Sequence, residues 1–239
     1  MATIRSALID VGYAKKDLRT DNQPKCDARF YTEDFAETFL PHLIVVGDSR
    51  EQKDWIEKAC EFYGIRFEKA VKDKKAGTEN LKEGDYTFKM QFGDKIEDYT
   101  GIVAYERKGS ISELYNNFKN GDRERIQREF MRFSEKGYKK VVLVVEYGEN
   151  IVDLINGKFE FIGHDGYYQQ KDVGKLVFAT IMAWKQNNGK NFEIYQNTDH
   201  PKMFWWILTD MYYWWRNELF NKQKQIKESE ENVNSIKNN

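Results

Sequence analysis

Residues 84–108 read GDYTFKMQFGDKIEDYTGIVAYERK, and this stretch decides the fold. Two runs within it, 86–92 and 102–108, are rich in aromatic and β-branched residues, as strands are. The segment 93–100 between them, GDKIEDYT, is polar and typical of a hairpin connection. The pattern therefore predicts an antiparallel pair of strands.

Apolar runs on both sides of this stretch predict the rest of a sheet. The run LIVV at 43–46 is short and continuous, and VVLVV at 141–145 is apolar throughout, as buried parallel strands are. Helices alternate with strands, which is typical of an α/β fold with a mixed central sheet flanked by helices. Further strands are expected at 65–71 and 192–196, and helices at 51–63, 111–118, 123–133, 173–188 and 201–220, with Asp172 as a cap.

Three regions are expected along the chain. Residues 1–40 are mixed and form an N-terminal extension with short helices, and residues 41–220 form one domain. Residues 221–239 are Lys, Glu, Gln and Asn with few apolar side chains, so a disordered tail is expected. Within the domain, 151–168 is a connection without a defined element.

Composition narrows the class of protein. There is no run of 18 apolar residues and no secretory leader, so we expect no membrane contact and an intracellular location, in the cytoplasm or a host's cytoplasm. Cys26, Cys60 and the three histidines show no zinc spacing. The net charge of -1 argues against a nonspecific nucleic-acid coat protein. Residues 105–140 nevertheless hold ten Lys/Arg and six Asp/Glu, a local charge of +4 (10 minus 6).

Asp85, Glu106 and Lys108 are the candidate catalytic residues. Side chains at i and i+2 of a strand share a face, so Glu106 and Lys108 point one way and Arg107 the other. Two neighbouring carboxylates repel unless a cation separates them, and oxygen ligands suit Mg²⁺ or Mn²⁺. Such a metal activates water for phosphodiester hydrolysis, which a lysine can assist. Taken alone, this common combination favours the simpler alternative, a surface hairpin with ordinary ion pairs.

The longer string resembles the signature of the XPF-type structure-specific nucleases. In that family GD is followed, after a gap, by ERK and an acidic residue, as in Gly84-Asp85 and Glu106-Arg107-Lys108 here. An apolar strand ends in DSRE at 48–51, GDRERIQ follows at 121–127, and a second apolar strand ends in Glu146. The resemblance covers residues 43–220 and implies a restriction-endonuclease-like fold of the PD-(D/E)XK superfamily. It also implies a metal-dependent endonuclease with DNA as its partner.

The resemblance also assigns roles to residues. Asp85 and Glu106, with Asp48, are expected to hold Mg²⁺ or Mn²⁺, and Lys108 to assist the attacking water. The family has an acid four positions beyond the lysine, whereas here the nearest is Glu113, which fits after a one-residue insertion at Gly109. The residues expected to bind DNA or support the site are Arg50, Glu51, Arg107, Arg125 and Gln127.

Several alternatives stay open at this stage. Asp48 or Ser49 could be the N-cap of the 51–63 helix, and Arg50 could pair with Glu51 or Glu146. Arg125 and Gln127 could lie on a solvated helix face. The chain has no room for a helicase domain, which leaves the substrate open among branched, flap and fork DNA in recombination, repair or replication. The rival functions are an inactive DNA-binding subunit with a nuclease fold, and an exonuclease.

The segment 201–220 predicts a helix that is apolar on two sides. One side should pack on the sheet, and the other should cover the N-terminal extension or meet a second subunit. A homodimer through this aromatic helix is therefore one hypothesis. Stacking of its aromatic rings on DNA bases is another hypothesis. The simpler interpretation is that these rings are buried in the hydrophobic core.

Overall fold

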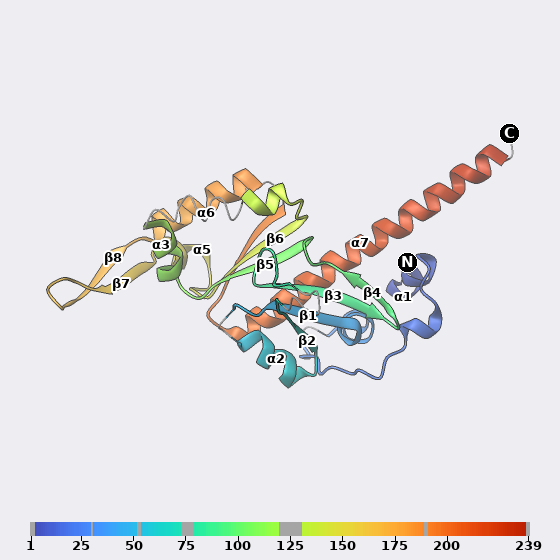
Figure 1. The fold of residues 1–239 in the computed structure, drawn as a ribbon, viewed down its shortest axis with the longest axis horizontal. Helices are drawn as coiled ribbons and strands as arrows, with labels where there is room; N and C mark the ends of the chain where they lie inside the picture. Colours follow the sequence, from blue (N-terminus) through green and yellow to red (C-terminus); the bar gives the residue numbers. More distant parts are fainter. Residues whose placement is uncertain are drawn as a thin grey trace.

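The computed structural model describes residues 3–29, 31–51, 54–72, 79–119, 131–188 and 191–237. This part of the chain forms a seven-stranded mixed sheet in the order β2-β1-β3-β5-β6-β9, with β4 added beside β3 (Figure 1). The predicted mixed central sheet flanked by helices is confirmed. Its strands are β1 (Leu43–Asp48), β2 (Arg66–Ala70), β3 (Tyr86–Phe92), β4 (Lys95–Asp98), β5 (Val103–Lys108), β6 (Lys140–Val145) and β9 (Phe192–Gln196).

The strand directions follow the chain connections. β3 runs antiparallel to β1, β4 and β5, whereas β1 and β2, β5 and β6, and β6 and β9 are parallel pairs. The apolar run at 141–145 is an interior parallel strand, as predicted. The prediction of a plain connection at 93–100 is wrong, because β4 lies inside it. β4 is mostly exposed and polar, so its sequence carries no alternation that would reveal it.

The helices of the described chain flank this sheet. They are α1 (Ile4–Asp10), α2 (Trp55–Tyr63), α3 (Ile111–Lys119), α5 (Ile151–Ile155), α6 (Gly174–Asn188) and α7 (His200–Lys237), with short η1 (Lys15–Leu18), η2 (Asp34–Phe39) and η3 (Leu40–His42). Gly64 ends α2 with φ 72°, the left-handed conformation expected of a C-terminal glycine. The predicted helix at 123–133 falls mostly outside the described residues, although 131–135 are helical.

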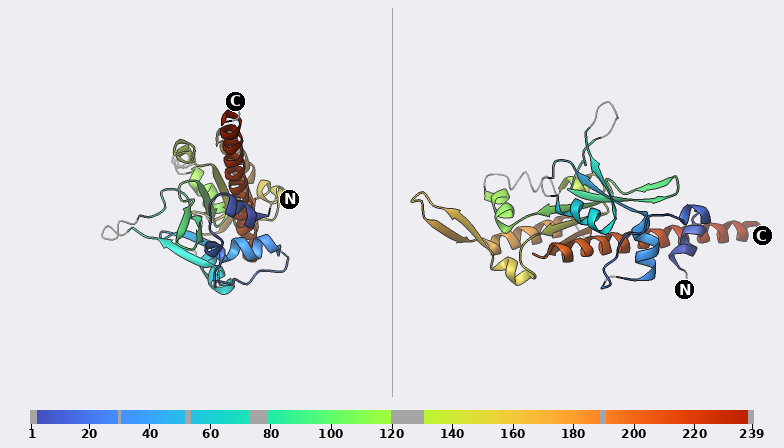
Figure 2. Two further views of the ribbon diagram at one scale, coloured as in Figure 1. Left: turned by 90° about the vertical axis from the view of Figure 1, so that its right-hand side faces the viewer. Right: turned by 90° about the horizontal axis from the view of Figure 1, so that it is seen from below.

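Alternation along the strands divides the core into two layers. Odd-numbered residues of β5 face α7, α1 and η2, in a cluster that includes Val103, Tyr105, Phe88 and Trp205. Even-numbered residues face α3, α5 and α6, as Ala104 does. Figure 2 shows helices on both sides of the sheet. On the second face, β1 carries only a small described cluster with Ile44, Val46 and Leu81, which leaves room for a polar site there.

The N-terminal extension packs on α7. The rings of Phe35 and Phe39 lie 5.3 and 5.4 Å from that of Tyr212, and Ile4 and Leu8 of α1 are fully buried. The aromatic side chains of α7 therefore pack on the sheet on one side and on the N-terminal extension on the other. No helix of the described chain is both long and apolar enough to cross a membrane.

α7 continues well beyond the domain boundary that the sequence suggests. We expected a disordered tail from residue 221, whereas α7 spans 38 residues, about 57 Å, and ends at Lys237 (Figure 1). Gln223 and Lys227 contact the Asp10 carboxylate of α1 at 2.6 and 3.5 Å. The Lys224–Glu228 pair has the i,i+4 spacing that stabilises a helix. Contacts with α1 therefore stabilise the first part of this extension, and composition alone does not reveal them.

The region 151–168, for which the sequence predicts no defined element, contains α5 and the first strand of a second, two-stranded sheet. β7 (Lys158–Ile162) and β8 (Tyr168–Asp172) form an antiparallel hairpin that projects from the body (Figures 1 and 2). Asp172 ends β8, and α6 begins at Gly174, so the predicted capping role of Asp172 is wrong. The polar sequence of β8, YQQKD, explains why the hairpin was missed.

Candidate active site

Three carboxylates lie in a row across three adjacent strands. Tyr86 of β3 pairs with β1 on one side and with Tyr105 of β5 on the other. Asp85 comes directly before Tyr86 and so lies between the ends of β1 and β5 that carry Asp48 and Glu106. All three residues line one cavity, so their side chains point to the same side of the sheet.

Backbone hydrogen bonds hold this row in place. Asp85 N–H donates to Tyr105 O at 2.9 Å, and Asp48 N–H donates to Asp85 O at 2.8 Å. Gly84 precedes Asp85 with φ +78°, and a Cβ atom at Gly84 would lie 2.9 Å from Ala104 Cβ. Glycine is therefore required here on two counts, backbone conformation and space.

The row opens on a cavity of about 330 Å³. Asp48 and Glu106 are 4% and 3% exposed, so both carboxylates are largely removed from water. The cavity is lined by five acidic residues, three basic residues and one glycine, which are Asp48, Glu51, Glu83, Asp85 and Glu106, then Arg50, Lys82 and Arg132, then Gly84. The formal charge of this lining is -2 (3 minus 5), the charge that one divalent cation balances.

Asp48 holds Arg50 at the cavity. Its Oδ1 accepts hydrogen bonds from Arg50 N and Nε at 2.7 and 2.9 Å, and its Oδ2 accepts one from Nη2 at 2.7 Å. These bonds raise the pKa of the Arg50 guanidinium. The sequence alternatives for Arg50 were Glu51 and Glu146, whereas the structure pairs its guanidinium with Asp48. The helix-cap alternative for Asp48 is wrong, because α2 begins only after Asp54, and Ser49 instead bonds Asn80.

Lys108 and Glu113 extend the site along the chain from Glu106. Lys108 Nζ lies 2.5 Å from Glu106 Oε1 and 4.0 Å from Glu113 Oε1. The other Glu113 oxygen accepts a 2.8 Å hydrogen bond from Gly109 N–H, and Ser110 Oγ accepts one from Glu113 N–H at 3.0 Å. Glu113 thus stabilises the start of α3 and contacts Lys108, and it does not line the cavity.

Arg107 points to the opposite face of the sheet, as the strand alternation predicts. Its side chain is 5% exposed and binds Glu146 through Nε and Nη2, the latter at 2.9 Å. Nη1 lies 3.5 Å from Glu51 Oε1. Burial raises the pKa of Glu146, but the hydrogen bonds and charge of Arg107 outweigh it, and the net pKa of Glu146 is lowered. This enclosure favours a supporting role for Arg107 over direct contact with DNA.

Two aromatic residues that the sequence analysis missed complete this network. Trp55 Nε1 donates a 2.7 Å hydrogen bond to Glu146 Oε1, and the Trp55 ring stacks on His200 at 4.6 Å. His200 Nε2 lies 3.4 Å from Glu146 Oε2. Trp55 starts α2 and His200 starts α7, so no sequence spacing relates them. Only packing brings both helix starts to the end of β6.

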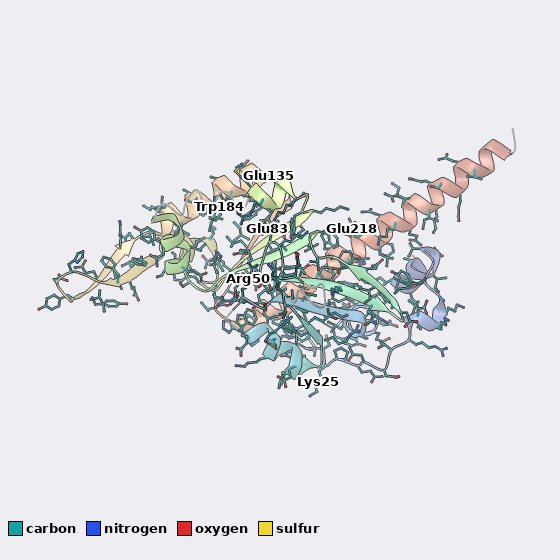
Figure 3. The ribbon with its side chains drawn as sticks, viewed as in Figure 1. Lys25, Arg50, Glu83, Glu135, Trp184 and Glu218 are labelled. Atoms are coloured by element: carbon teal, nitrogen blue, oxygen red, sulfur yellow. The ribbon has the colours of Figure 1, made fainter. Side chains whose placement is uncertain are left out.

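Glu83 is the other residue that the sequence analysis passed over. It is 8% exposed, and its Oε1 accepts hydrogen bonds from Arg132 Nε at 3.0 Å and from Lys136 Nζ. Figure 3 labels Glu83 and Arg50, both in the central part of the molecule. The one sequence feature that could have indicated Glu83 is its position two residues before Asp85. Of the predicted site residues, Arg125 and Gln127 lie outside the described residues.

The donor chemistry at the cavity fits a hard divalent cation. Among the described residues, no group of three or more His, Cys, Asp or Glu is arranged to hold a metal ion. Mg²⁺ commonly binds through one or two carboxylates and keeps several waters, so a three-residue set is not required. Asp85 and Glu106 supply two carboxylates from adjacent strands, without sulfur or imidazole ligands. The residues present fit Mg²⁺ or Mn²⁺.

Comparisons with known proteins concern the whole chain. No protein-family model matches it, and no curated protein matches it. Among solved structures, it is similar to XPF from Aeropyrum pernix with a TM-score of 0.41 and 14% identity, over 82% of this chain and 69% of that one. Similarity this low transfers no residue roles, so the site rests on its own geometry.

Proposed function

We propose that this protein is a metal-dependent deoxyribonuclease that hydrolyses phosphodiester bonds within DNA. The observation that carries the proposal is the row of Asp48, Asp85 and Glu106 on one cavity, with Lys108 bound to Glu106. An ordinary surface hairpin does not bury two carboxylates beside a third and line their cavity with net negative charge. The same residues also match the motif that the sequence shares with XPF-type nucleases.

The proposal gives each residue a task. Asp85 and Glu106 would hold Mg²⁺ or Mn²⁺, which supplies an activated water and polarises the phosphate. Lys108 would orient the attacking water or neutralise charge that develops on the phosphate. Asp48 already binds Arg50 through both of its oxygens, so we assign it the positioning of Arg50 beside the metal rather than the strongest coordination.

The cations of the cavity would receive the DNA backbone. The Arg50 and Arg132 side chains are 63% and 44% exposed, although their acidic partners Asp48 and Glu83 are buried. Each buried acid thus fixes an arginine whose outer part stays accessible, an arrangement suited to phosphate contacts. Branched, flap or fork DNA is the proposed substrate, on the strength of the sequence resemblance. A homodimer through α7 stays a hypothesis, for which the exposed ring of Tyr213 is available.

The deciding experiment is cleavage of labelled duplex, single-stranded, flap, fork and four-way-junction DNA in Mg²⁺, Mn²⁺ or EDTA. Asp85→Ala and Lys108→Ala are compared with Asp94→Ala, a matched change at an exposed carboxylate in the β3–β4 turn. We expect metal-dependent cutting that the first two variants lose by at least about 100-fold and that the third keeps. A covalently closed circle separates endonuclease from exonuclease activity.

Two outcomes would count against the proposal. A folded protein that binds these DNAs but cuts none of them would be the inactive DNA-binding subunit considered above. Cutting that survives in EDTA, or in Asp85→Ala, would place the chemistry elsewhere in the molecule.

A further inference from the structure

The β7–β8 hairpin presents apolar side chains to solvent far from the core. Ile162, Tyr167 and Tyr168 at its tip are 74%, 74% and 63% exposed. Ile162 and Tyr168 are cross-strand partners, so they lie side by side on one face, and Tyr167 is in the adjoining turn. Exposing such a cluster of apolar side chains to water is unfavourable, so its place at the end of a projecting element indicates an interaction surface.

The tip is an ordered element. Gly163 N–H donates to Tyr167 O at 2.9 Å, and Gly166, with φ +78°, donates back to Gly163 O at 3.0 Å. Asp165 accepts from Tyr167 N–H at 3.1 Å, and Glu160 accepts from the Tyr168 hydroxyl. Asp165 and Glu160 are therefore bonded within the hairpin itself, and the ring of Tyr168 is held in position by its hydroxyl.

The root of the hairpin is continuous with the candidate active site. A Cβ atom on Gly157 would lie 1.9 Å from Ile111 Cδ1, so the root packs directly against the start of α3. Ile111 follows Lys108 by three residues. Phe159 of β7 also packs on Tyr115 of α3, with ring centroids 5.0 Å apart. The hairpin is thus anchored on the helix that leaves the candidate catalytic strand.

Charge differs between the root and the tip. Lys158, Lys171 and Lys175 are exposed at the root beside Asp172, a local charge of +2 (3 minus 1) that suits a phosphate backbone. From 159 to 170 there is no Lys or Arg. The tip instead offers aromatic and aliphatic surface, which suits the faces of bases and not phosphates.

We propose that the β7–β8 hairpin is a wedge that stacks on unpaired or partly unstacked bases at a branch in the DNA. This inference rests on the proposed function and names its substrate class. Lysines at the root guide the backbone from the active site, and Ile162, Tyr167 and Tyr168 contact bases at the branch, as apolar wedges do in bent DNA.

The length of the hairpin sets the distance between the candidate active site and the DNA branch. Five residues of β7 span about 17 Å, and the three-residue step from Lys108 to Ile111 adds at most about 10 Å. At about 3.4 Å per nucleotide, the branch lies roughly five to eight nucleotides from the scissile phosphate.

The test uses the full chain with Ile162→Ser and the double variant Tyr167→Ala/Tyr168→Ala. Phe62→Ala on α2 is the matched control, because Phe62 is 68% exposed but lies away from the hairpin. Forks with 2-aminopurine at each position from two to ten nucleotides from the cut report stacking by fluorescence quenching, in Ca²⁺ or EDTA. Cut positions are then mapped on the same forks in Mg²⁺.

We expect quenching at the branch with wild type and Phe62→Ala, and its loss in both tip variants. Binding to forks should weaken about 5-fold or more, with binding to plain duplex unchanged. Tip variants that quench, bind and cut forks as wild type does would overturn the wedge even if the nuclease is real. Wild type that quenches but never cuts would keep the wedge and reject the nuclease. Loss of self-association in the tip variants, with DNA binding intact, would assign the tip to a second copy instead.

Discussion

The backbone N–H of Arg107 donates a 2.7 Å hydrogen bond to Oδ2 of Asp85, while the guanidinium of the same residue is buried on the other face of the sheet. There it binds Glu146 and Glu51. A single residue of β5 therefore links the carboxylate row to an ion network that packs between α2 and α7. The position of Asp85 therefore depends in part on Glu146, which does not line the cavity.

Arg107→Met should lower the free energy of unfolding by about 3–5 kcal/mol, because it leaves Glu146 buried beside Glu51 without its cation. Urea unfolding of Arg107→Met, Glu146→Gln and the double variant measures this. The double variant should lose less than the sum of the two single changes. Additive losses would show that the pair is not coupled. Arg29→Met, in an exposed ion pair with Asp27, is the control and should cost little.

Arg107→Lys should impair metal binding more than it impairs folding. A lysine keeps the charge but loses the two-pronged contact with Glu146, so the β5 backbone at Asp85 is held less firmly. We expect about a 10- to 100-fold higher Mn²⁺ concentration for half-saturation, measured by direct titration of the ion. Unchanged Mn²⁺ affinity would mean that Asp85 is positioned by β3 alone.

Stability should fall in acid partly through Glu146. Its pKa is lowered in the folded protein from an ordinary value of 4.5, so its stabilisation is fully present above that pH. The stabilisation is lost as the pH falls through the lower folded-state pKa. Unfolding free energies from about pH 3 to pH 7 should therefore decline less steeply in acid for Glu146→Gln than for wild type. Parallel curves would contradict this role of Glu146.

Gly84→Ala should destabilise the protein and displace Asp85, since both backbone strain and the contact with Ala104 oppose a Cβ atom there. Gly101 offers a matched control, with φ +81° but nothing within 4 Å of an added Cβ. We expect Gly101→Ala to cost about 1–3 kcal/mol by thermal unfolding, and Gly84→Ala to cost more. Equal losses would indicate that Ala104 moves aside easily.

Trp215→Ala should cost about 3–5 kcal/mol, because its side chain is fully buried among Phe39, Phe92 and other rings. Tyr213→Ala on the same helix, 52% exposed, should cost far less in the same chemical denaturation experiment. This comparison separates the core interpretation of α7 from base stacking. A stable Trp215→Ala protein with weakened DNA binding would favour stacking.

Much of the candidate site could be predicted because it depends on local rules. Strand alternation predicts Glu106 and Lys108 on one face and Arg107 on the other, and in the structure Lys108 contacts Glu106 whereas Arg107 contacts Glu146. The pairing of 86–92 with 102–108 brought Asp85 to them. The hairpin β7–β8 and the end of α7 were not predicted, because β8 and the end of α7 are polar in sequence and their order comes from packing on α3 and α1.

The sequence by itself determined the mixed sheet, its central strands and the carboxylates that share a face, because hydrophobic periodicity and strand alternation act over a few residues. The tertiary structure alone decided which charges pair: Asp48 with Arg50, Glu83 with Arg132, and Glu146 with Arg107. It also brought Trp55 and His200 to Glu146. Ion pairs between distant residues depend on burial and on which helix starts meet which strand ends. Charged residues are common along the chain, so only their positions in the folded protein determine which of them form an ion pair.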